Sequence, residues 1–234
     1  MRTRIYVDGY NLYYSCLKGT HFKWLDLLNL FESQIFPSIL MPGGKPLMGT
    51  AVLEPVAIKF FTANILEKAA SAEDSLRCQE QYHSALEKHC PGRVQIVKGY
   101  YACREARARA IDPLDPKKQP RDCIFVDIWK LEEKQTDVNL AIHALSDALT
   151  GKVDQVVIVT NDTDIAPAME MIRQLTNVQI GLVIPTVNEV REVNADLDKH
   201  SHWTRTQITT QELQAAQLPR VIKKGKKTAT KPIS

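Results

Sequence analysis

The sequence lacks the features that mark membrane-spanning, disulfide-bonded or zinc-knuckle proteins. Its 234 residues include five cysteines, an odd number with no C-x-x-C pair, which argues against a disulfide framework and a zinc knuckle. No apolar run approaches the length that spans a bilayer. The opening, MRTRIYVDGYN, enters a strand-like run at once and does not resemble a signal peptide. We therefore expect reduced cysteines and a cytoplasmic location.

Motifs of several enzyme classes are also missing. Gly9 stands alone after the first apolar run, so the chain has no G-x-G-x-x-G dinucleotide-binding motif. No Ser-His-Asp or Cys-His arrangement indicates a nucleophilic enzyme. The pair His200 and His202, beside Asp196 and Asp198, has residue types found in metal sites, but such a spacing is common by chance.

The excess of positive charge is confined to the C-terminal tail. The formal net charge is +3, yet residues 219–234 hold six cations and no acid, which leaves 24 basic and 27 acidic residues and a charge of −3 for the rest. Such a tail offers an electrostatic contact for phosphate groups. The alternative is a solvated, disordered end.

Apolar runs and helical periodicities alternate along the chain. Strands are predicted at residues 5–7, 56–63, 94–101, 123–129, 155–159 and 178–184, and helices at 24–36, 73–89, 136–149, 165–175 and 190–197. This alternation predicts an α/β fold, a three-layer Rossmann-like sandwich with a mainly parallel central sheet. Without an internal repeat or a second core, we expect one domain over residues 1–205 and a C-terminal extension over 206–234. Residues 104–121 break the pattern and predict a loop or the tip of a β-ribbon.

Acidic residues follow two of the predicted strands. Asp8 comes directly after residues 5–7, and Asp162 and Asp164 follow residues 155–159. Ligands of doubly wound sheets bind beyond the carboxyl ends of the strands, so neighbouring strands would bring the three carboxylates together. Crowded carboxylates attract a hard divalent cation such as Mg²⁺ or Mn²⁺. The alternative for each acid is a turn or helix-capping role.

A further pair of charged residues lies at the start of the helix predicted over residues 136–149. Asp137 near that helix N-terminus would reach the same pocket, and Lys134 would meet a phosphate group there. The alternative is a capping acid and a solvated lysine.

Three blocks together resemble the NYN domain family, a part of the PIN-like nuclease superfamily. They are VDGYN with Asp8 and Asn11, EKQTDVNLAI at 133–142, and TNDTDIAP at 160–167. The resemblance runs over roughly residues 4–200, with the blocks in the family's order. The third block is typically S-G-D-S-D-F, so both acids are kept here while Asn161 replaces a glycine.

The resemblance implies a metal-dependent endoribonuclease. Asp8, Asp137, Asp162 and Asp164 would hold Mg²⁺ or Mn²⁺, which activates a water molecule for attack on the scissile phosphate. Asn11 would fix a carboxylate or contact the phosphate, and Lys134 would offset charge that develops in the transition state. The RNA backbone would lie along the cations of the irregular segment: Arg104, Arg107, Arg109, Lys117, Lys118 and Arg121.

Two other functions stay open. The opening YVDGYNLYYSCLKGTHFKWLDL resembles a subgroup of NYN-domain proteins to which a pyridine-ring monooxygenase has been assigned. A non-catalytic RNA-binding module is the other possibility, and a homodimer is one option for the assembly. Four aromatic residues are candidate stacking platforms, with a core or rim role as the alternative: Tyr10, Tyr13, Tyr14 and Trp203.

Overall fold

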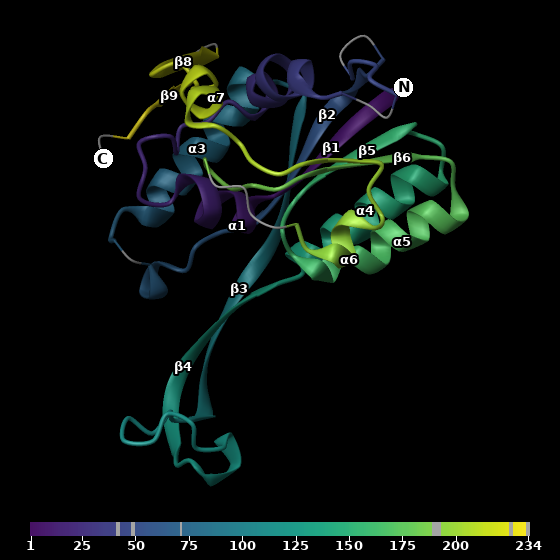
Figure 1. The fold of residues 1–234 in the computed structure, drawn as a ribbon. Helices are drawn as coiled ribbons and strands as arrows, with labels where there is room; N and C mark the ends of the chain where they lie inside the picture. Colours follow the sequence, from purple (N-terminus) through teal and green to yellow (C-terminus); the bar gives the residue numbers. More distant parts are fainter. Residues whose placement is uncertain (41–42, 48–49, 71, 189–192, 225–226, 233–234) are drawn as a thin grey trace.

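A seven-stranded sheet forms the centre of the protein in a computed structural model (Figure 1). The structure describes residues 1–40, 43–47, 50–70, 72–188, 193–224 and 227–232. The sheet order is β4-β3-β2-β1-β5-β6-β7, and every neighbouring pair is parallel except β3 and β4. Its strands are β1 (Arg2–Asp8), β2 (Val52–Ala63), β3 (Val94–Arg109), β4 (Phe125–Lys134), β5 (Gln155–Val159), β6 (Gln179–Val183) and β7 (Trp203–Arg205). The predicted α/β fold with a mainly parallel sheet is confirmed.

The centre of the sheet is the point at which the strand order reverses. β1 pairs in parallel with β2 on one side and with β5 on the other, with Val7 opposite Val159. All five residues of β5 are buried, as in a parallel strand covered on both faces. The carboxyl ends of β1 and β5 therefore meet at one edge, where doubly wound sheets bind their ligands.

Helices cover both faces of the sheet. Side chains alternate across a strand, so Ile5 and Val7 pack into the core on one face and Tyr6 into the core on the other. The second core contains residues of α4 and α5, among them Leu140 and Met169. The main helical segments are α1 (Gly9–Leu12), η1 (Tyr13–Leu17), α2 (Leu27–Asn29), η2 (Leu30–Ile35), α3 (Ser75–His89), α4 (Thr136–Leu149), α5 (Ala166–Leu175), α6 (Ala195–Asp198) and α7 (Thr210–Ala215).

Two predicted helices begin later than their apolar patterns. The helix predicted from residue 24 starts at Leu27, because Asp26 caps it by accepting a hydrogen bond from the Asn29 N–H, and it continues as a π-helix. The helix predicted over residues 190–197 starts at Ala195, where the Asn194 side chain caps it. Residues 189–192 of that prediction lie outside the described residues.

β3 and β4 continue beyond the sheet as a two-stranded arm, residues 100–134, which projects from the body of the protein (Figure 1). The ladder runs from Tyr100 opposite Lys134 to Arg109 opposite Phe125, so the predicted β-ribbon is confirmed and its tip is shorter than residues 104–121. At the base, a Cβ on Gly99 would lie 2.3 Å from the Lys134 carbonyl oxygen. Only glycine allows the strands to cross so closely there.

The C-terminal segment packs against the sheet's helices instead of extending into solvent. β8 (Val221–Lys224) and β9 (Lys227–Thr230) form a hairpin that contacts α3. Ile222 and Ala229 are buried in the same core as Ile5, and the Trp24 indole N–H donates to the Pro219 carbonyl at 2.9 Å. No helix among the described residues combines the length and apolar character required to cross a bilayer.

Candidate active site

Asp8 ends β1 and lies at the base of a pocket at the sheet's carboxyl edge. Its side chain is buried and accepts three hydrogen bonds, from the Asn11 backbone N–H at 2.9 Å, Asn11 Nδ2 at 2.7 Å and Thr160 Oγ1 at 2.7 Å. Burial raises the pKa of Asp8, and these hydrogen bonds oppose the rise because they stabilise the charged form. The side chain of Asp8 therefore caps α1 and also lines the pocket in which the sequence predicts a site.

Gly9 lets α1 begin directly after β1. A Cβ on this residue would lie 2.6 Å from the Phe61 carbonyl oxygen of β2. Any larger residue would push the helix away from the sheet and would move Asn11 away from Asp8. The sequence Asp8-Gly9 thus fixes a carboxylate and its amide partner at the strand end.

Asp162 and Asp164 follow β5 on the other side of the pocket. Asp162 accepts a hydrogen bond from the Asp164 N–H at 3.0 Å and caps the short helix Thr163–Ile165. Thr160 links the two strand ends, because its hydroxyl donates to Asp8 and accepts from the Asp162 N–H at 3.0 Å. Asp162 lines the pocket, whereas Asp164 is exposed beside it.

Asp137 reaches the same pocket from the first turn of α4. The helix starts after Gln135, whose φ of 72° is in the left-handed region and turns the chain sharply out of β4. Burial and then the negative charges of Asp8 and Asp162 raise the pKa of Asp137 to about 6. Glu133 and Asp164 add to the same effect, so five carboxylates act on one another here.

The acidic pocket, as we call the cavity lined by Asp8, Asp137 and Asp162, has a volume of about 290 Å³ and a wall of tyrosines. Tyr10 and Tyr14 line it, with their ring planes tilted by 35° and their ring centroids 4.3 Å apart. The Tyr101 hydroxyl donates to Glu133 at 2.8 Å, and Lys18 lies 4.7 Å from the Tyr14 ring. Among the described lining residues, acids outnumber cations four to one: Asp8, Glu133, Asp137 and Asp162 against Lys18.

The donor set of the pocket fits a hard divalent cation. All its charged donors near Asp8 are carboxylate oxygens, the ligands that Mg²⁺ and Mn²⁺ prefer, and no imidazole or thiolate joins them among the described lining residues. Burial and then the negative charges of the neighbouring carboxylates raise the pKa of Asp137, and a cation in the pocket would offset those charges. Asp8, Asp137 and Asp162 all line the pocket and would hold such an ion, while both oxygens of Asp8 and Oδ1 of Asp162 also accept hydrogen bonds.

The structure places the predicted basic residues elsewhere. Lys134 does not line the pocket; its Nζ lies 3.3 Å from a Glu132 carboxylate oxygen. The predicted RNA contacts are all on the arm, and four of them are paired with acids. These pairs are Arg104 with Glu132 (3.3 Å), Arg107 with Asp127 (3.4 Å), Lys118 with Asp112 (3.0 Å) and Arg121 with Asp122 (3.8 Å); Lys117 is exposed near the arm's tip.

Sequence reasoning missed Glu133 and Tyr101, which line the pocket, and Thr160, which donates a hydrogen bond to Asp8. Thr160 and Glu133 lie inside the blocks TNDTDIAP and EKQTDVNLAI, so their positions beside the acids were the signal that could have found them. Tyr101 carried no signal, because its place depends on how β3 pairs with β4. Trp203, a candidate stacking residue, is buried against Gly181 in the core.

A separate group with metal-ligating side chains lies where α3 ends near the start of α2. Ligand atoms of Asp26, His89 and Cys90 lie within 4.8 Å of one another. His89 Nε2 is 3.0 Å from an Asp26 carboxylate oxygen, and the Cys90 thiol donates to Asp26 at 3.7 Å. Asp26 also caps α2, so this group already has a structural role.

Comparisons with known proteins place this geometry in context. A family model described as the NYN domain matches residues 2–199. The chain is 52% identical over 235 residues to the 6-hydroxy-3-succinoylpyridine 3-monooxygenase HspA of Pseudomonas putida, and the match covers 100% of this chain and 75% of that protein. A crystal structure of a protein of unknown function from Vibrio parahaemolyticus is 20% identical, with a TM-score of 0.47 and coverage of 88% of this chain and 92% of that one.

Proposed function

The chain belongs to the NYN domain family, and we propose that it is an enzyme that oxygenates a small pyridine-type ring at the acidic pocket. The observation that carries this proposal is Asp137, a carboxyl group with a pKa of about 6 inside a tyrosine-lined pocket. A base is most effective when its pKa lies near the working pH. The named reaction of the 52% identical relative, which matches this chain from end to end, supports the choice of substrate.

Asp137 supplies the proton chemistry of the proposed reaction. Its carboxylate removes the proton of a hydroxyl group on the ring, which shifts negative charge into the ring and makes its carbon atoms more reactive towards oxygen. Burial and then the charge of Asp8, whose carboxylate is held by Asn11 and Thr160, raise the pKa of Asp137. The flat faces of Tyr10 and Tyr14 hold the ring at the mouth of the pocket.

The overall reaction also needs a reductant. One atom of dioxygen enters the substrate and the other leaves as water, at the expense of two electrons and two protons. We propose that a reduced nicotinamide supplies the electrons as a diffusible two-electron donor and is oxidised in the reaction.

Metal-dependent hydrolysis of RNA is the second candidate, and the convergence of carboxylates favours it. Asp8, Asp137, Asp162 and Asp164 would hold Mg²⁺ or Mn²⁺, which would supply Lewis acidity to the phosphate and to the attacking water. Asn11 fixes Asp8 in this reaction as well. The pairing of four cations of the arm with neighbouring acids weighs against it, because these acids reduce the positive charge that the arm presents to a phosphate backbone.

One pair of assays separates the two candidates. The purified chain is incubated with 6-hydroxy-3-succinoylpyridine, a reduced nicotinamide and ¹⁸O₂, and in parallel with single-stranded RNA, each with Mn²⁺ or with a chelator. We expect ¹⁸O in the product whether or not the chelator is present, loss of that label in Asp137→Asn, and no loss in Asp115→Asn on the arm. RNA cleavage that needs Mn²⁺, without any ¹⁸O incorporation, would replace the first candidate by the second.

A further inference from the structure

The group of Asp26, His89 and Cys90 lies at the end of α3 that is remote from the acidic pocket. Each of the three side chains offers a ligand atom, and these atoms lie within 4.8 Å of one another. No other three His, Cys, Asp or Glu side chains among the described residues gather within this distance. Ser75, the first residue of α3, lines the acidic pocket, so roughly 20 Å of helix separates the two places at 1.5 Å per residue.

The spacing of the three ligand atoms is close to that around a coordinated ion. His89 Nε2 is 3.0 Å from an Asp26 carboxylate oxygen, and Cys90 Sγ is 3.7 Å from the other oxygen of Asp26. Bonds of about 2.0–2.3 Å to a tetrahedral Zn²⁺ place its ligands roughly 3.3–3.8 Å apart. Shifts of about 1 Å at the ends of the side chains therefore suffice to bring all three atoms onto one ion.

The chemistry of the three donors indicates which ion they would hold. An imidazole nitrogen, a thiolate sulfur and a carboxylate oxygen are all ligands of Zn²⁺, whereas Mg²⁺ takes oxygen ligands. The charged donors of the acidic pocket near Asp8 are carboxylates only. The two places would therefore select different ions.

Asp26 can bind an ion and keep its place in the fold. Its Oδ1 accepts the capping hydrogen bond from the Asn29 N–H at 3.1 Å, while its Oδ2 faces His89. An ionised carboxylate has about four lone-pair sites, so the cap does not use them all. Asp26 and Cys90 are buried, whereas the side chain of His89 is 34% exposed. An ion would therefore enter from the side of His89, and water on that side would complete four ligands.

The binding of an ion has to displace the proton of Cys90. Burial and then the charge of Asp26 raise the pKa of this thiol to about 12, so it keeps its proton at pH 7 until a metal replaces it. Arg93 acts on Cys90 in the opposite direction. Its Nη1 donates to the backbone carbonyl oxygens of Glu54 at 3.1 Å and Pro55 at 3.4 Å, which hold the guanidinium to the backbone before β2 and in its first turn of chain.

We propose that Asp26, His89 and Cys90 form a Zn²⁺ site that fastens the end of α3 to the start of α2. The S–H bond of Cys90 breaks, its proton passes to the solvent and a Zn–S bond forms, with no change of oxidation state. The Asp26 backbone N–H donates to the Ala216 carbonyl at 2.8 Å, so the same ion would also hold the segment that carries the C-terminal chain. The ion therefore stabilises the fold and takes no part in the reaction at the acidic pocket.

Cobalt tests the site directly, because a thiolate bound to Co²⁺ gives a charge-transfer band in the near ultraviolet and carboxylates do not. The full chain is freed of metals with a chelator, dialysed, kept reduced, and titrated with Co²⁺ and then with Zn²⁺. We expect a band that saturates at one Co²⁺ per chain and disappears when Zn²⁺ displaces the Co²⁺. Absence of the band at millimolar Co²⁺ would overturn the proposal.

Three variants assign the band to its ligands. Cys90→Ser should abolish it, and His89→Gln, at a partly exposed position, should weaken Co²⁺ binding at least tenfold. Cys78→Ser is the matched control and should leave the band unchanged, because Cys78 also lies on α3 and donates to an aspartate, Asp74, at 3.5 Å. A band that survives in Cys90→Ser, or an unaltered affinity in His89→Gln, would overturn the site.

Stability gives a second readout that does not depend on turnover. A ligand that binds only the folded state raises the unfolding temperature, so Zn²⁺ should raise it in the wild type and in Asp137→Asn but not in Cys90→Ser or His89→Gln. The response of Asp137→Asn separates this site from the acidic pocket, whatever the outcome of the ¹⁸O₂ assay. An equal rise in all four proteins would place the ion elsewhere and overturn the proposal.

Discussion

Two aspartates on α4, ten residues apart, have opposite electrostatic surroundings. Asp137, at the start of the helix, faces other carboxylates, and burial and their charges raise its pKa to about 6. Burial would also raise the pKa of Asp147 near the helix end, but hydrogen bonds from Lys59, Arg4 and Tyr6 outweigh it and lower the pKa to about 2. One helix therefore carries Asp137, which has no cationic partner among the described residues, and Asp147, which is surrounded by cations.

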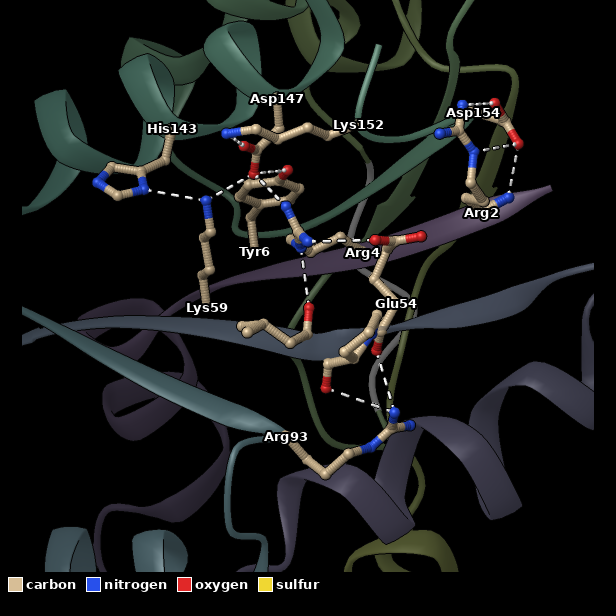
Figure 2. Close-up of polar contacts among 12 residues, drawn as sticks. Arg2, Arg4, Tyr6, Glu54, Lys59, Arg93, His143, Asp147, Lys152 and Asp154 are labelled. Atoms are coloured by element: carbon tan, nitrogen blue, oxygen red, sulfur yellow. Dashed lines mark hydrogen bonds and ion pairs between the residues drawn. The ribbon is translucent and has the colours of Figure 1, made fainter. Parts of the chain in front are cut away.

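The contacts of Asp147 are drawn in Figure 2. Arg4 Nη1 lies 2.7 Å from Asp147 Oδ2, Lys59 Nζ 2.5 Å, and the Tyr6 hydroxyl 2.8 Å. Arg4, Tyr6 and Asp8 alternate along β1 and share one face of the strand. Arg4 and Tyr6 of this strand thus stabilise the charge of Asp147 near the end of α4, whereas Asp8 adds a negative charge beside Asp137 at the start of α4. We infer that the contacts of Asp147 stabilise the fold and that the negative charge around Asp137 serves the function of the protein.

The largest effect that we expect is the loss of catalysis in a variant of Asp137. Asp137→Asn keeps the shape of the side chain and removes the base, so turnover of the ring substrate should fall on the order of 10²–10⁴-fold. The free energy of unfolding should stay the same or rise in chelator, because one of several repelling charges is gone. Initial rates and urea unfolding of both proteins measure this. A variant that is much less stable than the wild type would show that Asp137 is structural.

The corresponding change at Asp147, which is surrounded by cations, should lower the stability of the fold. Asp147→Asn leaves Lys59 buried without its carboxylate partner and leaves Arg4 with only Glu54, at 3.6 Å, so the free energy of unfolding should fall by roughly 3–5 kcal/mol. Lys152→Gln is the matched control: Lys152 also pairs with Asp147, at 3.6 Å, but is largely exposed and should change stability by less than about 1 kcal/mol. Similar losses in the two variants would contradict the distinction between the two ends.

The two aspartates should also give stability opposite pH dependences. The folded pKa of Asp137, about 6, exceeds its ordinary 3.8, so its contribution is complete below about pH 4 and is lost as the pH rises through 6. The folded pKa of Asp147, about 2, lies below 3.8, so its contribution is present above about pH 4 and is lost as the pH falls through 2. Urea unfolding in chelator from pH 4 to 8 should show the wild type losing stability relative to Asp137→Asn. A pH-independent difference would mean that the carboxyl group titrates normally.

The sequence predicted the sheet and the convergence of Asp8, Asp137 and Asp162 because both depend on local patterns. An apolar strand followed by an acid fixes where that acid lies once the strands are parallel, and β1 does pair with β5 as the pattern required. Asp137 follows from the start of α4. Lys134, three residues earlier, turns to Glu132 instead, since the left-handed turn at Gln135 separates its direction from that of the helix.

The network around Asp147 and the packing of the C-terminal segment could not be predicted in this way. Both depend on contacts between distant segments, such as Lys59 with Asp147 or Trp24 with Pro219. The arm illustrates the same limit for charge: its cations were visible in the sequence, but their neutralisation depends on the register of β3 against β4, which places Arg107 opposite Asp127. The pairing of these cations therefore depends on contacts between strands, and the predicted contact of the arm with RNA stays a prediction.

The smallest effect that we expect is on the ion pairs of the arm, in which cations and acids face each other at the solvent-exposed surface. Residues 99–134 hold eight cations and seven acids, a net charge of only +1. The double variant Arg107→Gln, Lys118→Gln breaks two exposed pairs and should change the free energy of unfolding by less than about 1 kcal/mol, because solvent already screens both partners. If the arm tracked an RNA backbone, the same variant would lower the salt dependence of RNA binding by about two ions, one for each cation that no longer neutralises a phosphate. We expect a change of less than about one ion, since cations that face carboxylates release few counterions, and RNA binding measured from 50 to 200 mM salt decides between the two.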